Sequence, residues 1–578
     1  MRKKNISAVV AAFTFAAAGS AFSFPYPNSG SLYRDVRDDS LHRKSERQDV
    51  AVEVPSEAAS PVQGEPLAVS HFVVYGNSAL GDEELTGVLE PFSHQLLTPA
   101  QLQLAADTLR REYRSRGLFA AQVYLPPQAI VDGIVTLHVY EGVLEEGGVE
   151  LHNEGGRVND ETVTAVLAGN LSTGAVMHRS EFERTILLVD DLPGITSHSI
   201  IYPGTEPGEA RFLMRTEDTP FVTGNVDMDN FGSYYTGAER LGATVYFNSP
   251  SGRGDQVTVR AVTSGGDSNY FFLDYSIPVS GSGLRLGGSI DYLDYEIGEE
   301  LGELGLEGDA ASLRLFASYP FVRSRHTNLA GSLEYAYLSL EDDGRTGEQL
   351  ADRRLHAVTL SIFGDHDDDR WANGENYFAG SVTGGTVDIR GGDAFEAFDS
   401  TNIGTDGSFA RLNFDLSRLQ HLGGAWSVFG GLAGQWASTN LDSSQKFYLG
   451  GPFSIPGYPT GELGGDHGAR LQVDVRYDLP YLPWGGDLQL SLFYTAGWAQ
   501  LFDDPWDGWE GDNPVIRNDI TLLSWGLACS QVWSEGIVLR SSIGRQIGSN
   551  DGRNPVTGED SDRSDDDYRA WFQAIYYF

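Results

Sequence analysis

The last eleven residues of the chain read as a β-strand that ends at the carboxyl terminus itself. Counting back by twos from the end gives a wholly apolar face of Phe578, Tyr576, Ala574, Phe572, Ala570 and Tyr568. A transmembrane β-barrel needs such a strand, because its last strand must pair with the first and leave no unpaired backbone in lipid. We therefore expect barrel closure, with an assembly signal made by Tyr568, Phe572, Tyr576 and Phe578.

The amino-terminal residues predict an export signal. Met1–Lys4 is basic, residues 6–18 form a short apolar core, and small residues follow near position 21. This core is shorter than the ~20 apolar residues that a transmembrane helix requires, so residues 1–23 are expected to be a signal peptide. Because no later stretch is long and apolar enough to span a membrane as a helix, the remaining chain is expected to be periplasmic, secreted or a barrel.

Charge and cysteine content narrow the class further. The chain has 40 Lys and Arg against 81 Asp and Glu, a net charge of −41, which would repel nucleic acid, so no nucleic-acid partner is expected. The single cysteine, Cys529, excludes an intramolecular disulfide and a cysteine metal cluster.

Much of the acid lies in short runs, including Glu341–Asp343, Asp365–Asp369 and Asp565–Asp567. We interpret them as solvated extracellular loops, and divalent-cation binding there is the alternative. The run at 365 begins like a calcium loop, but Arg370 replaces the required Gly and Asn376 the required Glu. No metal site and no cofactor is therefore expected.

Residues 67–218 show the pattern of two small α/β units. The first has a strand at 69–75, helices at 82–92 and from 98 to Gly117, and strands at 121–125 and 134–140. Its second helix opens with a capping box, Thr98–Gln101, and carries an apolar stripe expected to be core, which consists of Leu102, Ala106, Leu109 and Tyr113. The second unit repeats this order more loosely, with a strand at 149–151, helices at 160–167 and 180–190, and strands at 197–202 and 210–215.

The polar stretch at 24–66 precedes these units. It is interpreted as a tether that can carry a plug segment, and it contains one charged stretch, 35–48, that could form a short helix.

After residue 218 an alternation with a period of two replaces the helical periods. Leu286 and Ile290, for example, alternate with Arg285 and Asp291. A soluble sandwich alternates in the same way, but the aromatic residues at strand ends, the terminal Phe578 and the export signal favour a membrane barrel. Residues 219–578 have room for about sixteen spanning strands of ~9–11 residues with turns. The charged positions of this alternation would line the lumen of the barrel. The candidates are Arg260, Arg285, Asp291, Arg314 and Glu334.

Two small α/β units before a carboxyl-terminal barrel resemble the Omp85 superfamily, and specifically its two-partner secretion transporters of the hemolysin secretion/activation type. The matching stretches are Leu125–Gly133 with Val139–Gly142, Leu192–Gly194 with Pro203–Gly204, and Asp229–Gly232 with Gly237 and Asn248–Pro250. The resemblance implies α+β POTRA domains at 67–144 and 145–218. It also implies a transmembrane antiparallel barrel of 16 strands at 219–578, in the outer membrane with the POTRA domains in the periplasm.

The same resemblance implies a long loop that folds back into the barrel and carries a VRGY/F motif. Here Ile455, Gly457 and Tyr458 fit the motif, and Pro456 replaces its Arg. The family pairs that Arg with the acid of an FxDxG motif on a lumen-facing strand, which here reads Phe493, Thr495 and Gly497, with Thr495 in place of the acid. Both charges are absent together. We expect the loop to fold inward still, held by packing of Tyr458 and by backbone bonds; an ordinary extracellular turn is the alternative.

The function expected from this resemblance is export of one large exoprotein without ATP. The POTRA domains would recognise its amino-terminal secretion domain while it is unfolded. Outer-membrane lipid and the barrel assembly machinery would be further partners. The alternatives are an assembly factor that inserts barrel or passenger proteins, and a passive porin or receptor. No GxSxG, Walker A or HExxH motif occurs, so an enzyme is not expected. The sequence does not name the cargo.

Overall fold

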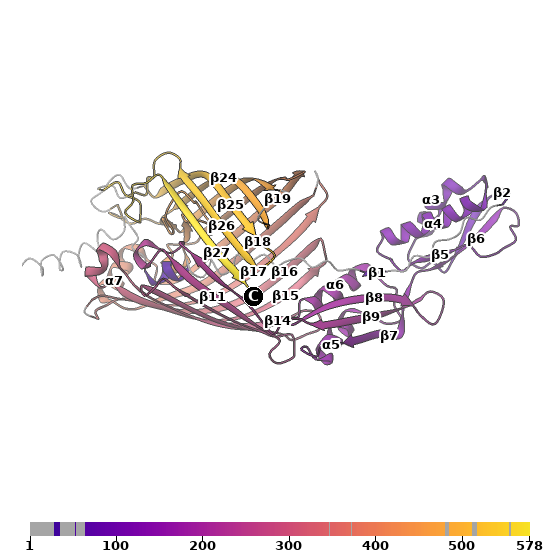
Figure 1. Cartoon of the computed structure of the whole chain (residues 1–578), viewed down its shortest axis with the longest axis horizontal. Coiled ribbons are helices and arrows are strands. Elements are labelled where there is room, and N and C mark those ends of the chain that lie inside the picture. The colour runs from indigo at the N-terminus through magenta and orange to yellow at the C-terminus, as the bar shows by residue number, and fades with distance from the viewer. Residues whose placement is uncertain are drawn as a thin grey trace, which may run out of the picture.

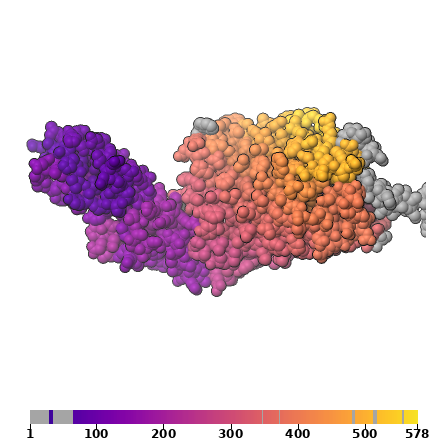
Figure 2. Space-filling view, turned by 180° about the vertical axis from the view of Figure 1, so that it is seen from behind, coloured from indigo at the N-terminus to yellow at the C-terminus, as the bar shows by residue number. Residues whose placement is uncertain are grey.

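A computed structural model describes residues 28–34, 52–53, 64–345, 347–370, 373–479, 485–510, 517–553 and 557–578. The expected signal peptide and the expected helix at 35–48 lie outside these residues. The described chain forms two small domains and a barrel that follow one another along the long axis (Figure 1). The first domain stands apart from the barrel, and the second adjoins it (Figure 2). No helix within the described ranges is long and apolar enough to cross a membrane.

The first domain packs two helices on a three-stranded sheet. The sheet order is β3 (His71–Tyr75), β6 (Ile134–Tyr140) and β5 (Gln122–Tyr124), and a small hairpin of β2 (Leu67–Val69) and β4 (Gln95–Leu97) lies beside it. The helices are α3 (Asp82–Leu89) and α4 (Pro99–Ser115), with a short 3-10 turn at Glu90–Phe92 between them. The single strand expected at 69–75 is interrupted at Ser70, whose N–H is bonded to the carbonyl of Gly133 at 2.6 Å.

Helix α4 begins at the predicted capping box. The Thr98 hydroxyl accepts from the Gln101 N–H at 3.3 Å, and the Gln101 side chain accepts from the Thr98 N–H at 2.8 Å. The stripe that follows is buried against the sheet, and consists of Leu102, Ala106, Leu109 and Tyr113. These four side chains therefore form core and offer no contact surface to a partner.

We expect Leu109→Ala to lower the free energy of unfolding of the first domain by about 2–5 kcal/mol. The Leu109 side chain is fully buried, so its removal leaves a cavity in the core. Pulse proteolysis of the full-length protein in urea measures the change. Leu104→Ala on the same helix is the matched control, because Leu104 is 49% exposed. Equal urea midpoints for the two variants would contradict the packing described.

The second domain has the same order of elements. It contains β7 (Val143–Asn153), α5 (Asp160–Asn170), α6 (Arg179–Asp190), β8 (Ile195–Pro203) and β9 (Glu209–Asp218). Strand β7 begins six residues earlier than expected, and its pairing with β9 is irregular between Leu144 and Val149. The sheet order is β1-β8-β9-β7, in which β1 (Val52–Glu53) comes from the stretch that precedes the first domain.

The described residues beyond 221 form a closed barrel of sixteen antiparallel strands, as the sequence predicted. The strands are β10 (Val222–Asp229), β11 (Arg240–Asn248), β12 (Gln256–Thr263), β13 (Ser268–Pro278), β14 (Arg285–Glu296), β15 (Glu307–Arg323), β16 (Thr327–Asp343), β17 (Gln349–Asp368), β18 (Gly374–Gly391), β19 (Gly407–Gly423), β20 (Trp426–Ala437), β23 (His467–Leu479), β24 (Asp487–Gln500), β25 (Asp519–Val532), β26 (Ile537–Gln546) and β27 (Tyr568–Tyr577).

The last strand closes the barrel against the first. Strand β27 pairs with β10 from Asn225↔Tyr577 to Asp229↔Gln573, and Phe578 exchanges two backbone hydrogen bonds with Gly224, each of 3.0 Å. The expected apolar face lies on the outside of the barrel, because its four aromatic side chains are exposed: Tyr568, Phe572, Tyr576 and Phe578. The other parity places Trp571 and Ile575 in the buried interior.

The second domain is docked on the short turns at one end of the barrel. Arg184 donates to the carbonyls of Ser282 and Pro320 at 2.8 and 2.9 Å. Asp191 accepts from Arg323 at 2.9 and 2.8 Å. This end also holds the carboxyl terminus (Figure 1), so the longer connections between strands lie at the opposite end.

The acidic run at 365–369 lies elsewhere than expected. Strand β17 runs toward the end that carries the small domains, so this run lies there and does not form an extracellular loop. Most of it is part of the strand ladder, since His366 pairs with Asn376 and Asp368 with Gly374. Asp368 also accepts from Arg418 at 2.7 Å, so its charge is already paired.

Candidate functional site

A long loop between β20 and β23, residues 438–466, enters the barrel. We call it the inward loop. It contains a 3-10 turn at Ser443–Gln445 and a small hairpin of β21 (Phe447–Leu449) and β22 (Leu463–Gly465). Ile455 and Tyr458 near its tip are fully buried. They belong to an apolar cluster that joins the inward loop to the inner wall of the barrel. Its members are Leu449, Ile455, Tyr458 and Leu463 of the loop, and Ala499, Ile520 and Leu522 of the wall.

The tip of the inward loop rests on the strands that close the barrel. The carbonyl of Pro456 accepts from the Trp571 indole N–H on β27 at 2.8 Å, and the Tyr458 hydroxyl donates to the carbonyl of Leu523 on β25 at 3.3 Å. A Cβ on Gly457 would lie 2.8 Å from the Ser524 Cβ and 3.0 Å from the backbone of Arg545. Packing and backbone hydrogen bonds therefore hold the tip, and it is not an ordinary extracellular turn.

The facing motif lies directly under this tip. Thr495 is 1% exposed, and its hydroxyl is 2.8 Å from that of Ser524, the residue that Gly457 approaches. A Cβ on Gly497 would lie 2.9 Å from Leu449 and 3.1 Å from Ile455. Phe493 is buried on the same parity of β24. Neutral groups therefore occupy the two positions at which the family resemblance implies an Arg and an acid.

The buried carboxylate of Glu462, just before β22, joins the inward loop to the connection between β26 and β27. Glu462 is 2% exposed. It accepts from the Asn550 amide at 2.6 Å and from the Ser561 N–H at 3.0 Å. Asp560 shares the Asn550 amide at 2.9 Å, so two carboxylates meet at one donor. Burial, reinforced by the charge of Asp560, raises the pKa of Glu462 above its usual range.

The raised pKa of Glu462 predicts how the stability of the inward loop changes with pH. The protonated form of Glu462 is favoured in the folded loop, so the extra stability is present in acid and is lost as pH rises through the raised pKa. We expect the frequency of channel openings in planar bilayers to increase from about pH 5 to about pH 8. Glu462→Gln should remove this pH dependence. A wild-type opening frequency that falls with pH over this range would contradict the assignment.

A second segment of the chain also occupies the lumen. Residues 28–34, which we call the plug segment, are helical from 29 to 34. Leu32 and Tyr33 are 4% and 2% exposed. The Tyr33 hydroxyl donates to Ser312 at 3.1 Å, and the Arg314 guanidinium lies over the Tyr33 ring at 5.6 Å. The tether therefore carries a plug, at positions that precede the helix expected at 35–48.

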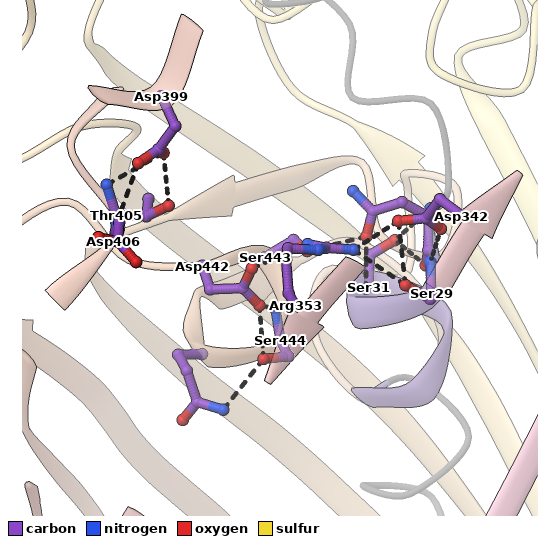
Figure 3. A network of polar contacts seen from close by, with 12 residues as sticks. Ser29, Ser31, Asp342, Arg353, Asp399, Thr405, Asp406, Asp442, Ser443 and Ser444 are labelled. Atoms are coloured by element: carbon purple, nitrogen blue, oxygen red, sulfur yellow. Dashed lines mark hydrogen bonds and ion pairs between the residues drawn. The ribbon is translucent and has the colours of Figure 1, made fainter. Parts of the chain in front are cut away.

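One arginine of the wall joins the plug segment to the inward loop (Figure 3). Arg353 on β17 is 3% exposed. Its Nη1 donates to Asp442 at 2.8 Å and to Ser443 at 3.1 Å, both in the inward loop. Its Nη2 donates to Ser29 of the plug segment at 2.9 Å and to Asp342 on β16 at 2.5 Å.

Asp342 completes this Arg353 cluster by binding the plug a second time. Its carboxylate accepts from the Ser29 N–H at 2.9 Å and from the Ser29 hydroxyl at 3.1 Å. Asp442 accepts from the Ser444 N–H at 2.9 Å. Arg353 was not singled out from the sequence, because it alternates like the other lumen-facing charges and nothing local marks it.

The five lumen candidates named from the sequence all have partners on the inner wall. Arg314 donates to Asp291 at 2.8 Å and lies 3.9 Å from Glu334. Arg260 donates to Asp227 at 3.1 Å. Arg285 bonds the carbonyl of Gly254 at 3.3 Å, at the rim that faces the second domain. Arg314, Asp291 and Glu334 lie in one charged band beneath Tyr33. Arg260 and Arg285 lie apart from this band.

Acidic side chains are numerous among the described residues, but they are not arranged there as a metal site. Within the described ranges, no group of three or more His, Cys, Asp or Glu side chains is placed to hold a metal ion. The site is instead a lumen occupied by two segments of the same chain. Both are held by hydrogen bonds, ion pairs and packing, and neither is part of the strand ladder that closes the wall.

Comparisons with known proteins agree with this architecture. The family model of the haemolysin secretion/activation protein ShlB/FhaC/HecB matches residues 208–504, and the ShlB-type POTRA domain matches residues 67–142. The heme/hemopexin transporter protein HuxB of Haemophilus influenzae (strain 86-028NP) is 24% identical over 562 residues, which cover 94% of this chain and 96% of HuxB. The outer membrane transporter CdiB of Escherichia coli O6:K15:H31 is 26% identical over 239 residues, 41% of this chain and 39% of CdiB.

Solved structures show the same fold. CdiB from Escherichia coli superposes with a TM-score of 0.69 at 20% identity, covering 94% of this chain and 96% of CdiB. BamA from Haemophilus ducreyi, without its POTRA domains 1–3, superposes with a TM-score of 0.51 at 16% identity, covering 89% of this chain and all of that structure. The family model alone covers half of the chain. The chain therefore belongs to the ShlB/FhaC/HecB family of haemolysin secretion/activation proteins, the outer-membrane transporters of two-partner secretion.

Proposed function

We propose that this protein exports one large exoprotein across the outer membrane. The POTRA domains would catch the exoprotein unfolded in the periplasm and pass it into the barrel. The observation that carries the proposal is the occupied lumen. The plug segment and the inward loop both lie in it and meet at Arg353, which supports a resting pore that these two segments close and that opens when they move aside.

Recognition would use main-chain hydrogen bonds at an open sheet edge. An extended peptide can add a strand to such an edge with little dependence on its own side chains. In the first domain β5 is an edge strand of three residues, and in the second domain β8 lies next to the edge, with only two residues outside it. Of these two sheets, that of the second domain is better placed to pass a bound peptide to the barrel, since α6 fixes this domain to the barrel turns through Arg184.

The proposed transport needs no nucleotide and no enzymatic step. Nothing in the sequence matches a nucleotide-binding loop. Folding of the exoprotein outside the cell would supply the direction, because a chain that folds there cannot return through the lumen. The charged band of Arg314, Asp291 and Glu334 would give the passing chain a polar wall.

The relatives differ in the cargo that their names suggest. HuxB is named for heme/hemopexin, and the hemolysin transporter protein HpmB of Proteus mirabilis for a hemolysin. We therefore propose a secreted protein with an amino-terminal secretion domain as the cargo class. Outer-membrane lipid against the exposed apolar belt, and the barrel assembly machinery during biogenesis, are the further partners proposed.

A second candidate function is assembly of barrel or passenger proteins in the membrane. The fold similarity to BamA favours it. A passive porin or receptor fits less well, because two segments of the chain fill the lumen.

The experiment that tests the proposal compares culture supernatants and outer membranes of cells with and without the gene, with a complemented strain as control. Loss of one large protein from the supernatant, with the outer-membrane proteome intact, is expected. An unchanged supernatant with altered outer-membrane proteins would contradict export and support assembly instead. No change in either fraction, with the gene and a candidate cargo both expressed, would favour the passive pore.

A further inference from the structure

The tip of the inward loop is bound by donors on two separate strands of the barrel wall. The Trp571 indole N–H on β27 donates to the carbonyl of Pro456. The Arg470 guanidinium on β23 donates through Nη1 to the carbonyl of Phe453. Strands β24, β25 and β26 lie between these two strands in the barrel. The two hydrogen bonds therefore fix the tip at both ends of one arc of the wall.

The backbone of the tip is folded so that these two carbonyls are available. Residues 451–454 and 455–458 form two consecutive β-turns, closed by backbone N–H to carbonyl bonds of 3.2 and 3.0 Å between the last and first residues of each turn. Proline is the second residue of each turn, at 452 and 456, where its fixed φ favours the turn. Phe453 and Pro456 are central residues of their turns. Their carbonyls take no part in the closing bonds and are free to accept from the wall.

The partner of Arg470 sets it apart from another arginine on the same face of β23. Arg476 donates to Asp474 at 2.8 Å and so has a carboxylate partner within its own strand. Arg470 instead donates to a backbone carbonyl of the inward loop. A cation that loses water in a confined lumen needs hydrogen bonds in exchange, and those from a charged donor are the stronger ones. Arg470 has this bond only while the loop lies in the barrel, so the guanidinium favours the inward position.

Aromatic contacts connect the same part of the loop to the strands that close the barrel. The Phe453 ring meets the Phe231 ring edge to face, with the centroids 5.3 Å apart. Phe231 meets the Trp571 ring in the same way at 6.1 Å. Phe231 follows β10, the strand that pairs with β27. The loop tip is therefore held from β23 on one side and from the closing strands on the other.

We infer that Arg470 is the positioning residue that keeps the inward loop in the barrel, acting with Trp571 on two carbonyls of the loop tip. Pro456 and Thr495 leave the loop and the strand beneath it without a charge at this place, and the wall supplies the cation instead. Release of the loop requires both donors to give up their carbonyls. The inference concerns the position of the loop and goes beyond the proposed function, since it holds whether the barrel exports its cargo or inserts it into the membrane.

The test measures how readily the loop tip leaves its place. The Ser454 hydroxyl is buried and makes no hydrogen bond within the described residues, so Ser454→Cys removes no bond. The parent protein for the test carries this change together with Cys529→Ser. In intact cells that produce the full-length protein, a membrane-impermeant maleimide labels the new thiol when the tip moves. We expect Arg470→Met to raise the labelling rate at least about tenfold, because the bond from the charged donor is lost.

Two further variants separate the donor from the bulk of the side chain. Arg470→Lys keeps a charged donor, and should bring the labelling rate back to within about threefold of the parent. Trp571→Phe keeps an aromatic ring but removes the indole N–H, and should raise the rate about fivefold. Arg476→Met is the matched control on the same face of β23. It should be labelled at the parent rate, because its partner is Asp474 and not the loop.

For each variant, the labelling rate refers to the folded barrel, measured by its heat-modifiable migration in gels. Labelling of Arg470→Met at the parent rate would overturn the inference. So would equal rates for Arg470→Met and Arg470→Lys, or a control as fast as Arg470→Met. If Arg470→Met gives too little folded barrel, Trp571→Phe decides, and the parent rate for that variant overturns the inference. Labelling needs no cargo, so the supernatant comparison and this test can fail independently.

Discussion

Arg353→Met is expected to open the pore more than any other single change in the lumen. The substitution keeps the bulk of the side chain but leaves the buried carboxylate of Asp442 and the partly buried carboxylate of Asp342 without their shared cation. Removing one partner of a buried ion pair costs about 3–5 kcal/mol. That cost falls on the closed state, because only there do the plug segment and the inward loop meet at this guanidinium. Single-channel recording in planar bilayers should show openings at least about tenfold more frequent than in the wild type.

The control for this prediction is Arg390→Met. Arg390 pairs with Asp388 at 2.6 Å on the neighbouring strand β18, but both side chains are more than half exposed, so little change is expected. A triple variant, Arg353→Met with Asp342→Asn and Asp442→Asn, should recover part of the closure, since removing all the charges avoids burying unpaired ones. A correctly folded Arg353→Met protein that stays as closed as the wild type would contradict the role of the Arg353 cluster.

Thr495→Asp is expected to loosen the inward loop when it is made alone, and to lose most of that effect when Pro456→Arg is added. Thr495 is 1% exposed and bonded only to neutral Ser524, so an aspartate there is a buried charge without a partner. An arginine at 456 would stand at the position that the family resemblance gives to the partner of this acid, and we expect it to recreate the implied ion pair. The double-mutant cycle should give a coupling energy of a few kcal/mol.

The measurement for this cycle is protease protection of the inward loop, followed together with conductance. Thr495→Val is the matched control, because it removes only a hydroxyl and should cost about 1 kcal/mol. If Thr495→Asp alone changes conductance as much as the double variant does, the two positions do not interact and packing alone explains the loop.

The sequence was sufficient for those parts of the fold that depend on periodicity. Strand alternation predicted a barrel and the aromatic face ending at Phe578 predicted the closing strand, because both follow from one buried and one lipid-facing side. The number of sixteen strands rested on the available length and partly on the family resemblance. The capping box at Thr98 was also readable, since its chemistry spans only four residues. The inward loop came instead from resemblance: nothing local in residues 450–459 predicts that they turn into a lumen.

The remaining features depend on contacts between distant residues. The plug segment has only six helical residues, too few for a recognisable apolar stripe, and it is defined by Asp342 and Arg353, more than three hundred positions away. The acidic run at 365–369 was assigned to the wrong end of the barrel, because its place depends on the number and direction of all the strands before it. Thr495 could be placed on the lumen side from its parity, but its contact with Ser524 required the register of β24 and β25.

Site-specific photo-crosslinking during export asks whether the exoprotein passes through the barrel lumen. The exoprotein found in the supernatant comparison would be fused to a domain that folds stably and stalls in the pore. A photoreactive residue would replace Glu334, on the lumen side of β16, or its neighbour Leu333, which is 53% exposed on the outer side. We expect crosslinks to the stalled exoprotein at position 334 and none at position 333. Crosslinks at neither position, or at 333 alone, during active export would show that the exoprotein does not pass through this lumen.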